Sequence, residues 1–371
     1  MAQTEQAAPA SAAPAPQDVA RKRPAYLSEL ARGTDRFHEP RRADCPWCGS
    51  HRLGVRLRTT DLIQHKPGTF TVDRCADCDH SFQNPRLTPE GLDFYYRDFY
   101  DGLGGKEAEK LFGAESSTKR YLSSTRAMRT HMEPQSWLDV GTGHGHFPSV
   151  AKTLLRHTNF DGLDLSDGVE EAVTEGRIRE GHRGFFPELA ASLAGRYDAV
   201  SMFHYLEHSR DPRAELEAAK TVLRPGGHLM IEVPDPESRY AKLLGKWWCS
   251  YFQPQHLHFV PLANLRKELE KSGFTVVGVE RREPHIPFDL TTAVALWLNC
   301  RFPKADLPWR AKAATASQLK VRKVAWWAAL PLLAVTYGLD MVLPPLITRM
   351  GFSNAYRVIA RKNRRQAPTG T

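Results

Sequence analysis

Cysteine is scarce in this chain, and its distribution excludes one large class of protein. Six cysteines occur among 371 residues, four of them in two tight Cys-x-x-Cys pairs, while Cys249 and Cys300 stand alone. This is not the framework of a small secreted domain held together by disulfides. The apolar run that marks a signal peptide is also missing after Met1. We therefore expect a reducing, cytoplasmic compartment.

Acidic residues become rare towards the C-terminus. The whole chain has 51 Lys and Arg against 42 Asp and Glu, a formal charge of +9. From Lys271 onwards 16 basic residues stand against 5 acidic ones, so the preceding part carries a net charge of −2. A local excess of this kind favours an anionic partner, such as a lipid surface or phosphate groups, over a uniformly basic nucleic-acid binder. A solvated basic tail is the alternative.

Hydrophobic periodicity is missing from the first part of the chain. Residues 1–40 are rich in Ala, Pro and Gln, so we expect a disordered tail. The chain as a whole is 41% apolar and 25% charged, which is typical of a globular protein.

The two Cys-x-x-Cys pairs predict a metal site made by Cys45, Cys48, Cys75 and Cys78. Each pair suits a tight turn whose sulfurs face one ion, and two such turns supply the four thiolates of a tetrahedral Zn²⁺ site. Two redox motifs or two disulfides are the alternatives, and His65 or His80 could substitute as a ligand. A closed shell leaves no position for water, so we expect a structural zinc ribbon with a strand at 69–72.

A glycine-rich turn follows an apolar run and is the most informative segment. Residues 137–140 read as a buried strand, followed by Gly141, Gly143 and Gly145 and a helix up to Leu155. Glycines let the backbone approach a ligand closely, and the helix start points its N–H groups at the turn. The pattern predicts a nucleotide-like cofactor, although dinucleotides and phosphates also bind such turns.

An acidic residue ends the second predicted strand, at residues 160–166. Asp164 lies 25 residues after Asp139. A carboxylate at this place can accept both hydroxyls of a ribose held over the first turn. The alternative is a helix N-cap, a role that Ser166 or Asp167 can fill instead.

Further strands and helices continue an α/β alternation. We expect strands at 196–205, 228–234, 274–280 and 355–360, and helices at 214–223 and 262–272, the first of them stopped by Pro-Gly-Gly at 225–227.

In combination these motifs resemble the class I S-adenosylmethionine-dependent methyltransferases. Leu-Asp-Val-Gly-x-Gly-x-Gly is followed by an Asp at a strand end, Tyr-Asp-Ala-Val, Glu-His-x-x-Asp-Pro, Leu-Arg-Pro-Gly-Gly and Ser-Gly-Phe, over residues 120–283. The resemblance implies a seven-stranded Rossmann-like sheet and S-adenosylmethionine as cofactor. One departure is Thr142-Gly143-His144, where the family often has Cys and a smaller polar residue. The third strand is not located.

The resemblance also assigns cofactor contacts. In the family the glycine turn abuts the methionine part of the cofactor, and the acidic strand end holds the ribose. These roles transfer to Asp139, Gly141, Gly143, Gly145 and Asp164. We add His204 as a cofactor contact and Phe186, with Phe185 and Glu188 beside it, as the adenine wall.

Methyl transfer is an in-line displacement that usually also needs a base. Open α/β sheets build their sites at the carboxyl ends of strands. The candidates after such strand ends are His204, Glu207, His208 and Asp235, and His256 and His258 are further candidates just before the helix at 262–272. We choose His256 and His208 as catalytic residues, with a purely structural role as the alternative for each.

A zinc ribbon joined to this sheet is also similar to deoxysugar C-methyltransferases of natural-product pathways and to methyltransferases of the cell envelope. The deoxysugar pattern has Tyr-x-Glu-His near where residues 253–256 read Gln-Pro-Gln-His. The histidine, His256, matches, whereas the tyrosine and the glutamate do not. O-methylation and C-methylation of a sugar or of another small or lipid-linked metabolite are both open.

A long apolar insertion at 284–350 separates the last two predicted strands. Residues 324–348, with Asp340 as their one charge, are close in length to the ~20 residues that a spanning helix needs. A single span is not expected, because Asp340 would be costly in a bilayer, prolines interrupt the helix, and the last strand must return to the same sheet. We expect an amphipathic or kinked helical hairpin that lies on the inner face of a membrane, where basic flanks suit anionic lipids, or that packs as a lid over the active site.

The sequence thus predicts an α/β protein with a small N-terminal ribbon and a helical insertion before the last strand. The expected divisions are 1–40 tail, 41–90 zinc ribbon, 91–130 helical linker or lid, 131–283 cofactor-binding domain, 284–350 insertion, 351–365 terminal strand and 366–371 tail. The aromatic run at 94–100 is expected to pack a helix or to line a lid. Alternatives to the methyltransferase function are a zinc-hooked rRNA methyltransferase and a non-catalytic module that binds a cofactor or partner.

Overall fold

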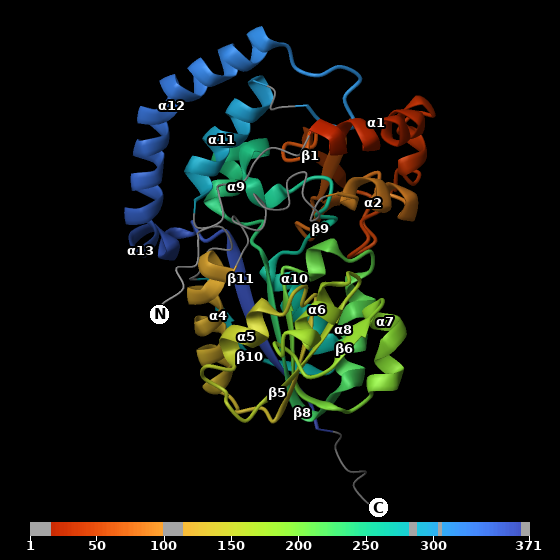
Figure 1. Cartoon of the computed structure of the whole chain (residues 1–371). Helices are drawn as coiled ribbons and strands as arrows, with labels where there is room; N and C mark the ends of the chain where they lie inside the picture. Colours follow the sequence, from red (N-terminus) through yellow and green to blue (C-terminus); the bar gives the residue numbers. More distant parts are fainter. Residues whose placement is uncertain (1–15, 99–113, 282–287, 303–305, 365–371) are drawn as a thin grey trace, which may run out of the picture.

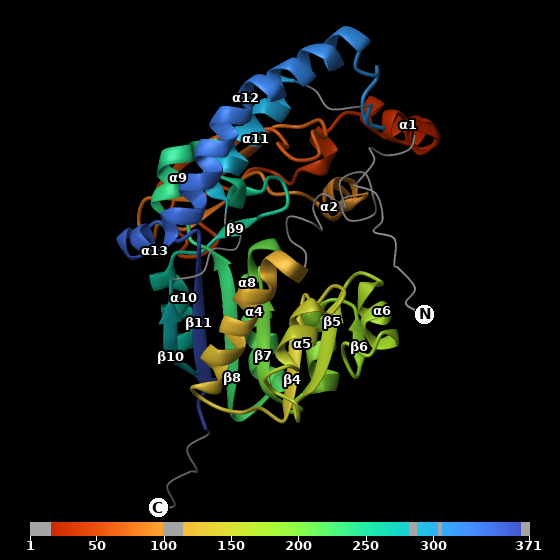
Figure 2. The same cartoon turned by 60° about the vertical axis from the view of Figure 1, so that its left-hand side comes forward.

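The computed structural model describes residues 16–98, 114–281, 288–302 and 306–364. They form two β-sheets with helices around them (Figure 1). A seven-stranded sheet makes one end of the molecule, and a smaller sheet with a group of helices makes the other, above the carboxyl ends of the parallel strands (Figure 2).

The large sheet has the order β10-β11-β8-β7-β4-β5-β6. Its strands are β4 (Ser136–Val140), β5 (Asn159–Asp164), β6 (Gly181–Arg183), β7 (Tyr197–Phe203), β8 (Leu223–Pro234), β10 (Phe274–Glu280) and β11 (Ala355–Lys362). All neighbours pair in parallel except β11, which runs antiparallel to both β8 and β10. The predicted Rossmann-like sheet with a returning terminal strand is confirmed.

Both faces of this sheet are buried, which explains why its central strands are nearly continuous apolar runs. Leu138 and Val140 of β4 point into one core cluster, and Trp137 points into the other, as the alternation of side chains along a strand requires. The helices of this part are α4 (Ala114–Arg129), α5 (His146–Ala151), α6 (Gly168–Thr174), α7 (Phe186–Leu189), α8 (Pro212–Val222) and α10 (Leu262–Lys271), with 3-10 turns η2 (Ala190–Leu193) and η3 (Leu206–His208).

The small sheet joins the predicted ribbon to a distant segment. Its strands are β1 (Leu53–Thr59), β2 (Phe70–Cys75), β3 (Ser81–Gln83) and β9 (His258–Phe259), in that order and all antiparallel. Strand β9 follows the loop that contains His256, one of the predicted catalytic residues, and it completes the ribbon sheet by pairing with β3. The ribbon is therefore built into the same body as the loop of His256.

The expected disorder of residues 1–40 is wrong for the part that the structure describes. Residues Pro16–Ala31 form α1, and η1 (Asp35–Phe37) follows. Val19 and Tyr26 of α1 are buried, and Tyr26 packs edge-on against Phe94 of α2 (Pro89–Tyr96) and against Trp309. Only a few widely spaced apolar residues hold this helix in place, so the sequence has no hydrophobic periodicity from which the helix could be predicted. Residues 1–15 and 366–371 lie outside the described residues.

The insertion forms a helical hairpin of α11 (Asp289–Arg301) and α12 (Ala316–Val342), followed by α13 (Pro344–Ile347) and η6 (Thr348–Met350). We expected Pro331 to interrupt the long helix, but α12 runs through it. Pro331 lies on the exposed side of α12, so the loss of one hydrogen bond is tolerated there. The hairpin packs on α9 (Arg239–Leu244) and the 3-10 turns η4 (Gly245–Trp247) and η5 (Cys249–Tyr251).

Two local expectations differ from the structure. The Pro-Gly-Gly segment at 225–227 was expected between a helix and a strand, but it belongs to β8, which already begins at Leu223. The pairing of β8 with β7 changes register there, between Tyr197 and Ala199. The third strand, not located from the sequence, is β6, an edge strand whose three residues Gly181, His182 and Arg183 carry no apolar side chain.

Candidate functional site

The glycine turn connects the carboxyl end of β4 to α5. Gly141, Gly143 and Gly145 have φ values of 75°, 51° and 72°, which glycine adopts without strain. A Cβ on Gly141 would come within 2.7 Å of Tyr205, and one on Gly145 within 3.0 Å of Ala172, so packing requires both glycines. A Cβ on Gly143 would meet no atom within 4 Å. The backbone at Gly143 therefore faces open space that a ligand can approach.

Asp164 ends β5 and turns its carboxylate onto this turn. Oδ2 accepts a hydrogen bond from the backbone N–H of Gly143 at 2.8 Å, and Oδ1 accepts from the N–H and the hydroxyl of Ser166 at 2.9 and 2.8 Å. Oδ2 has a further lone pair for one ribose hydroxyl, and Oδ1 can accept the second when the Ser166 hydroxyl rotates away. Asp167 stands at the N-cap of α6 without a capping hydrogen bond from its side chain. Asp164 is thus held at the turn and is half-exposed beside it.

Asp139 lies inside the sheet below the turn. Its Oδ1 accepts from the Ser201 hydroxyl at 2.6 Å, and that hydroxyl oxygen in turn accepts from the indole N–H of Trp137 at 2.9 Å. Burial raises the pKa of Asp139 to about 7. These contacts brace β4 against β7, and a direct contact between Asp139 and the cofactor stays a prediction.

The prediction that Phe186 forms the adenine wall is wrong. Phe186 begins α7 and is fully buried in the main core cluster, so none of its surface is left for a ligand. Phe185, one residue earlier, is 57% exposed, and Glu188 is exposed on the same short helix. The ring that can face a ligand is therefore that of Phe185. The sequence could not tell which of two adjacent aromatic residues is buried, because the strand before them was not located.

His204 and Glu207 follow the end of β7. His204 has a positive φ of 50°, and its Nδ1 lies 3.1 Å from Oε1 of Glu207. Glu207 is almost fully buried, and its Oε2 has no hydrogen-bond partner among the described residues. Burial raises the pKa of Glu207 to about 8, so the carboxyl is neutral near pH 7. An unsatisfied buried carboxyl oxygen is uncommon, and it marks a place where a bound molecule can complete the hydrogen bonding.

His256 reaches the same place from the loop between η5 and β9. Its Nδ1 donates to the carbonyl of Ser250 at 2.8 Å, which puts the proton-accepting lone pair on Nε2. Nε2 lies 4.0 Å from Oε1 of Glu207, and the ring packs edge-on against His208 at 4.5 Å between centroids. A buried imidazole whose tautomer is set by a backbone carbonyl suits a general base.

His208, at the end of η3, contacts a residue from the N-terminal part of the chain. Its Nδ1 lies 2.7 Å from the hydroxyl of Tyr96 and 3.1 Å from the carbonyl of Gln255. Burial lowers the pKa of His208 to about 4, so the ring is neutral. Tyr96 is a site residue that the sequence placed only in a packing or lid segment, and no local spacing announces a contact across 112 residues.

The rest of that aromatic run serves packing where the structure describes it. Phe94 and Tyr95 are fully buried in the cluster under α1 and η1, which confirms helix packing for these two rings. Phe99 and Tyr100 lie outside the described residues.

Asp235 and His258 are occupied by structural contacts. Asp235 forms an ion pair with Arg281, with Oδ2 2.7 Å from Nε. His258 belongs to β9, and its Nδ1 lies 3.1 Å from Nε2 of His80 in a buried, stacked pair. His258 therefore links β9, beside His256, to the ribbon, and Asp235 links the end of β8 to the residue that follows β10.

The ribbon holds that loop directly. The side chain of Gln83 in β3 donates to the side chain of Gln253 at 2.9 Å, and its backbone N–H donates to the carbonyl of Leu257 at 2.9 Å. Together with the pairing of β3 and β9, these bonds flank His256 on both sides in the sequence. The position of His256 therefore depends on the folded ribbon.

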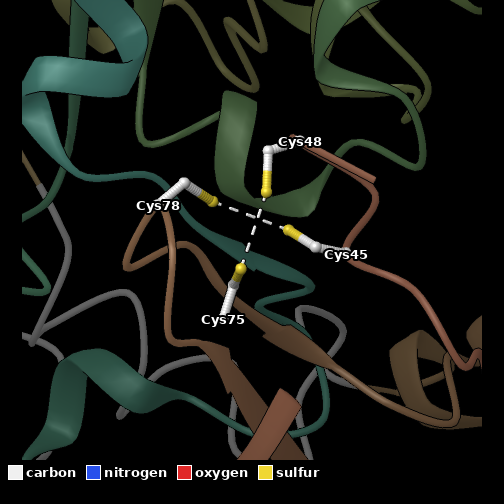
Figure 3. A group of neighbouring side chains, drawn as sticks. All are labelled: Cys45, Cys48, Cys75 and Cys78. Carbon is white, nitrogen blue, oxygen red and sulfur yellow. Dashed lines mark hydrogen bonds between the residues drawn. The ribbon is translucent and has the colours of Figure 1, made fainter. Parts of the chain in front are cut away.

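The four ribbon cysteines fit a zinc ion. Sγ of Cys45 lies 3.7 Å from Sγ of Cys78, and Sγ of Cys48 lies 3.5 Å from Sγ of Cys75. A tetrahedron with Zn–S bonds of about 2.3 Å has edges of about 3.8 Å, whereas a disulfide needs about 2.05 Å. Figure 3 shows the sulfurs pointing at a common centre. Neither His65 nor His80 belongs to this group.

Among the described residues, two other groups place metal-ligand atoms within reach of one another. Glu207, His208 and His256 form the first, and Asp161, Glu180 and His182 form the second, each with its atoms within 4.8 Å. In the second group Arg179 neutralises Asp161 across 2.8 Å. In the first, a cation would have to displace the proton of Glu207.

Comparison with known proteins identifies the sheet and its turn. The family model described as a methyltransferase domain matches residues 114–279. The ubiquinone biosynthesis O-methyltransferase of Paraburkholderia xenovorans (strain LB400) is 32% identical over 187 residues, covering 46% of this chain and 80% of that protein. The enzyme of the same name from Acinetobacter baumannii (strain AYE) is 25% identical over 155 residues. That match covers 38% of this chain and 63% of the relative's length.

Solved structures of the same kind are also similar. An S-adenosylmethionine-dependent methyltransferase from Archaeoglobus fulgidus is 20% identical with a TM-score of 0.43, covering 69% of this chain and 98% of that one. One from Thermotoga maritima, described as a possible histamine N-methyltransferase, is 16% identical with a TM-score of 0.43, covering 73% and 100%. On the family match, the P. xenovorans relative and the strand order, the chain belongs to the class I S-adenosylmethionine-dependent methyltransferases.

Proposed function

We propose that this enzyme methylates a small or lipid-linked metabolite, with a sugar as one acceptor class, and that His256 takes the proton of the acceptor. One observation carries the proposal: the predicted cofactor contact and the cluster around the predicted base lie at the ends of neighbouring strands. The contact between Gly143 and Asp164 lies at the ends of β4 and β5, and the cluster of Glu207 and His256 lies beyond the end of β7, next to β4. Open α/β sheets place ligands at such strand ends.

The cofactor residues in this proposal are Gly143, Asp164 and Phe185. S-adenosylmethionine supplies a methyl group on a positively charged sulfur. The open backbone at Gly143 admits its methionine part, and the Asp164 carboxylate accepts the ribose hydroxyls. The exposed ring of Phe185 is the surface available for adenine. His204, beside Glu207, borders the same space.

His256 acts as the base. As the acceptor oxygen or carbon takes the methyl group that the bound cofactor would supply, its proton would pass to Nε2 of His256. The carbonyl of Ser250 keeps the Nδ1 proton in place and stabilises the imidazolium that results. His208 packs against this ring as a neutral neighbour and fixes its orientation. A base in this position suits a hydroxyl acceptor, in line with the O-methyltransferase name of the curated relatives.

The zinc ribbon serves this chemistry without taking part in it. Four thiolates leave no coordination position for substrate, so the ion stabilises the ribbon. The ribbon in turn orients the loop of His256 through Gln83 and β9. We place the protein in the cytoplasm, with contact to the inner face of a membrane through residues 324–348, which suits a lipid-linked acceptor better than RNA.

The test is transfer of labelled methyl groups from S-adenosylmethionine into an extract of the producing cells. We expect label in a small-molecule or lipid fraction, and partition between water and organic solvent separates these two acceptor classes. His256→Ala should lower the transfer by ~10²–10⁴-fold. His157→Ala, at an exposed position two residues before β5 begins and at the opposite end of the sheet from the site, should not. Label found only in RNA would contradict the proposal.

A further inference from the structure

The long helix α12 presents an apolar surface to solvent. It lies at the periphery of the molecule in both views, with α11 on its inner side (Figures 1 and 2). By length and composition it could cross a membrane, yet only 6% of its most apolar window is buried. Val324, Trp327, Val335 and Val342 are each at least 60% exposed. We call the side of α12 opposite α11 the outer face, and these four residues define it.

The polar residues within this apolar helix are turned the other way. Oδ2 of Asp340 accepts from the backbone N–H of Thr291 at 2.8 Å and from its hydroxyl at 2.7 Å, at the start of α11. At the other end of α11, Arg322 donates to Asn299 at 2.8 Å and to the carbonyl of Phe302. The anion lies at the N-terminus of α11 and the cation at its C-terminus, as the helix dipole favours. The two clamps are 18 residues apart on α12, so the helix is fastened along its length.

These clamps explain how an apolar helix can carry charge and keep an apolar outer face. All residues of α12 are described, and its one acidic residue, Asp340, is buried. The exposed charges of α12 are Lys320 and Lys323 at its start, and exposed Arg349 follows its other end. The outer face is therefore an apolar stripe with positive charge at both ends, which complements an anionic lipid surface.

We propose that the outer face of α12 lies in the plane of a membrane and binds anionic lipid headgroups, without crossing the bilayer. Crossing would require the helix to leave α11 and to bury Asp340 and Arg322 in hydrocarbon. Strand β11 follows α13 closely and pairs with both β8 and β10, so the chain returns to the sheet directly. A second copy of the chain on this face would cover the stripe but would leave the lysines unexplained. The inference rests on the membrane contact named in the proposed function, and it adds the face that makes the contact, its in-plane orientation and the charge of the lipids.

Vesicle sedimentation of the full chain tests the inference. We expect the wild type to pellet with phosphatidylcholine vesicles that contain phosphatidylglycerol and to pellet less without it. Trp327→Glu combined with Val335→Glu should keep the protein in the supernatant, while Val55→Glu, at an exposed apolar site on β1 away from the outer face, should pellet as the wild type does. Lys320→Gln and Lys323→Gln, which leave the apolar stripe and the clamps intact, should each weaken binding about fivefold at low salt.

Three results would overturn the inference. The first is a wild type that pellets no more with vesicles than without them. The second is pelleting that the glutamate pair does not change. The third is a dimer in solution that the glutamate pair dissociates, without any vesicle binding. Calorimetry with S-adenosylmethionine in the absence of vesicles separates this inference from the proposed function. A glutamate variant that binds the cofactor normally but no longer binds vesicles supports the membrane surface. A wild type that binds vesicles but not the cofactor refutes the proposed function alone.

Discussion

A single methyl group added at Gly143 tests whether the cofactor lies against the glycine turn. Gly143 has a φ of 51°, and a Cβ there would meet no protein atom within 4 Å. Gly176, at the end of α6, has a φ of 69° and equally open surroundings, but it lies outside the proposed site. The two positions therefore form a matched pair, which differs only in whether a ligand is expected to face the new methyl group.

The backbone cost should be the same at both positions. An alanine in the left-handed region costs ~1–2 kcal/mol, which lowers the melting temperature by about 2–4 °C for each kcal/mol in a domain of this size. Gly143→Ala should in addition crowd the cofactor. Overpacking of one methyl group costs ~1–3 kcal/mol, a loss of affinity of roughly 5- to 150-fold.

Calorimetric titration with S-adenosylmethionine and thermal unfolding measure the two effects separately. We expect both variants to lose similar stability, and only Gly143→Ala to lose affinity. Equal cofactor affinity in Gly143→Ala and the wild type would refute the placement of the cofactor against the turn.

Three further predictions concern the base, the metal and the buried carboxyl. His256→Ala should lower the rate of methyl transfer by ~10²–10⁴-fold with little change in cofactor affinity, and an unchanged rate would exclude it as the base. Removal of zinc by a chelator, or Cys75→Ser, should release about one zinc per chain by elemental analysis. The loss should suppress methyl transfer more than cofactor binding, because the ribbon orients the loop of His256 and not the glycine turn. Burial raises the pKa of Glu207 to about 8. The protonated carboxyl therefore contributes fully to the free energy of unfolding below about pH 4.5, and this contribution, on the order of a few kcal/mol, is lost as pH rises through 8. Glu207→Gln should remove that part of the pH dependence in unfolding experiments, and parallel curves for variant and wild type would contradict the buried, neutral carboxyl.

The features that were predicted from the sequence depend on local backbone chemistry. Gly141 to Gly145 announce a turn because three closely spaced residues adopt positive φ, and the apolar run before them announces a strand buried on both faces. The cysteine pairs announce a metal site because their spacing alone brings two sulfurs together in each turn. The ribose role of Asp164 was predicted because the residue ends β5, the next strand after the glycine turn.

The features that were missed depend on long-range packing. Strand β6 has three residues at a sheet edge, and pairing with β5 defines it without any apolar side chain of its own. Tyr96 becomes a site residue only because α2 is packed against the end of β7. Asp340 was read from the sequence as a bare charge that argues against a membrane-spanning helix, and its hydrogen bonds to the start of α11 could not be predicted from the apolar run alone.

The central claim is that S-adenosylmethionine binds at the ends of β4 and β5 with its ribose on Asp164. Calorimetric titration of the wild type, Asp164→Ala and Asp167→Ala tests it most directly, since the two aspartates are three residues apart and only the first contacts the glycine turn. Loss of two hydrogen bonds to a charged acceptor costs ~3–6 kcal/mol, so Asp164→Ala should weaken binding by at least about 100-fold. Asp167→Ala should bind as the wild type does. Undiminished binding by Asp164→Ala, or no binding by the wild type, would contradict the account.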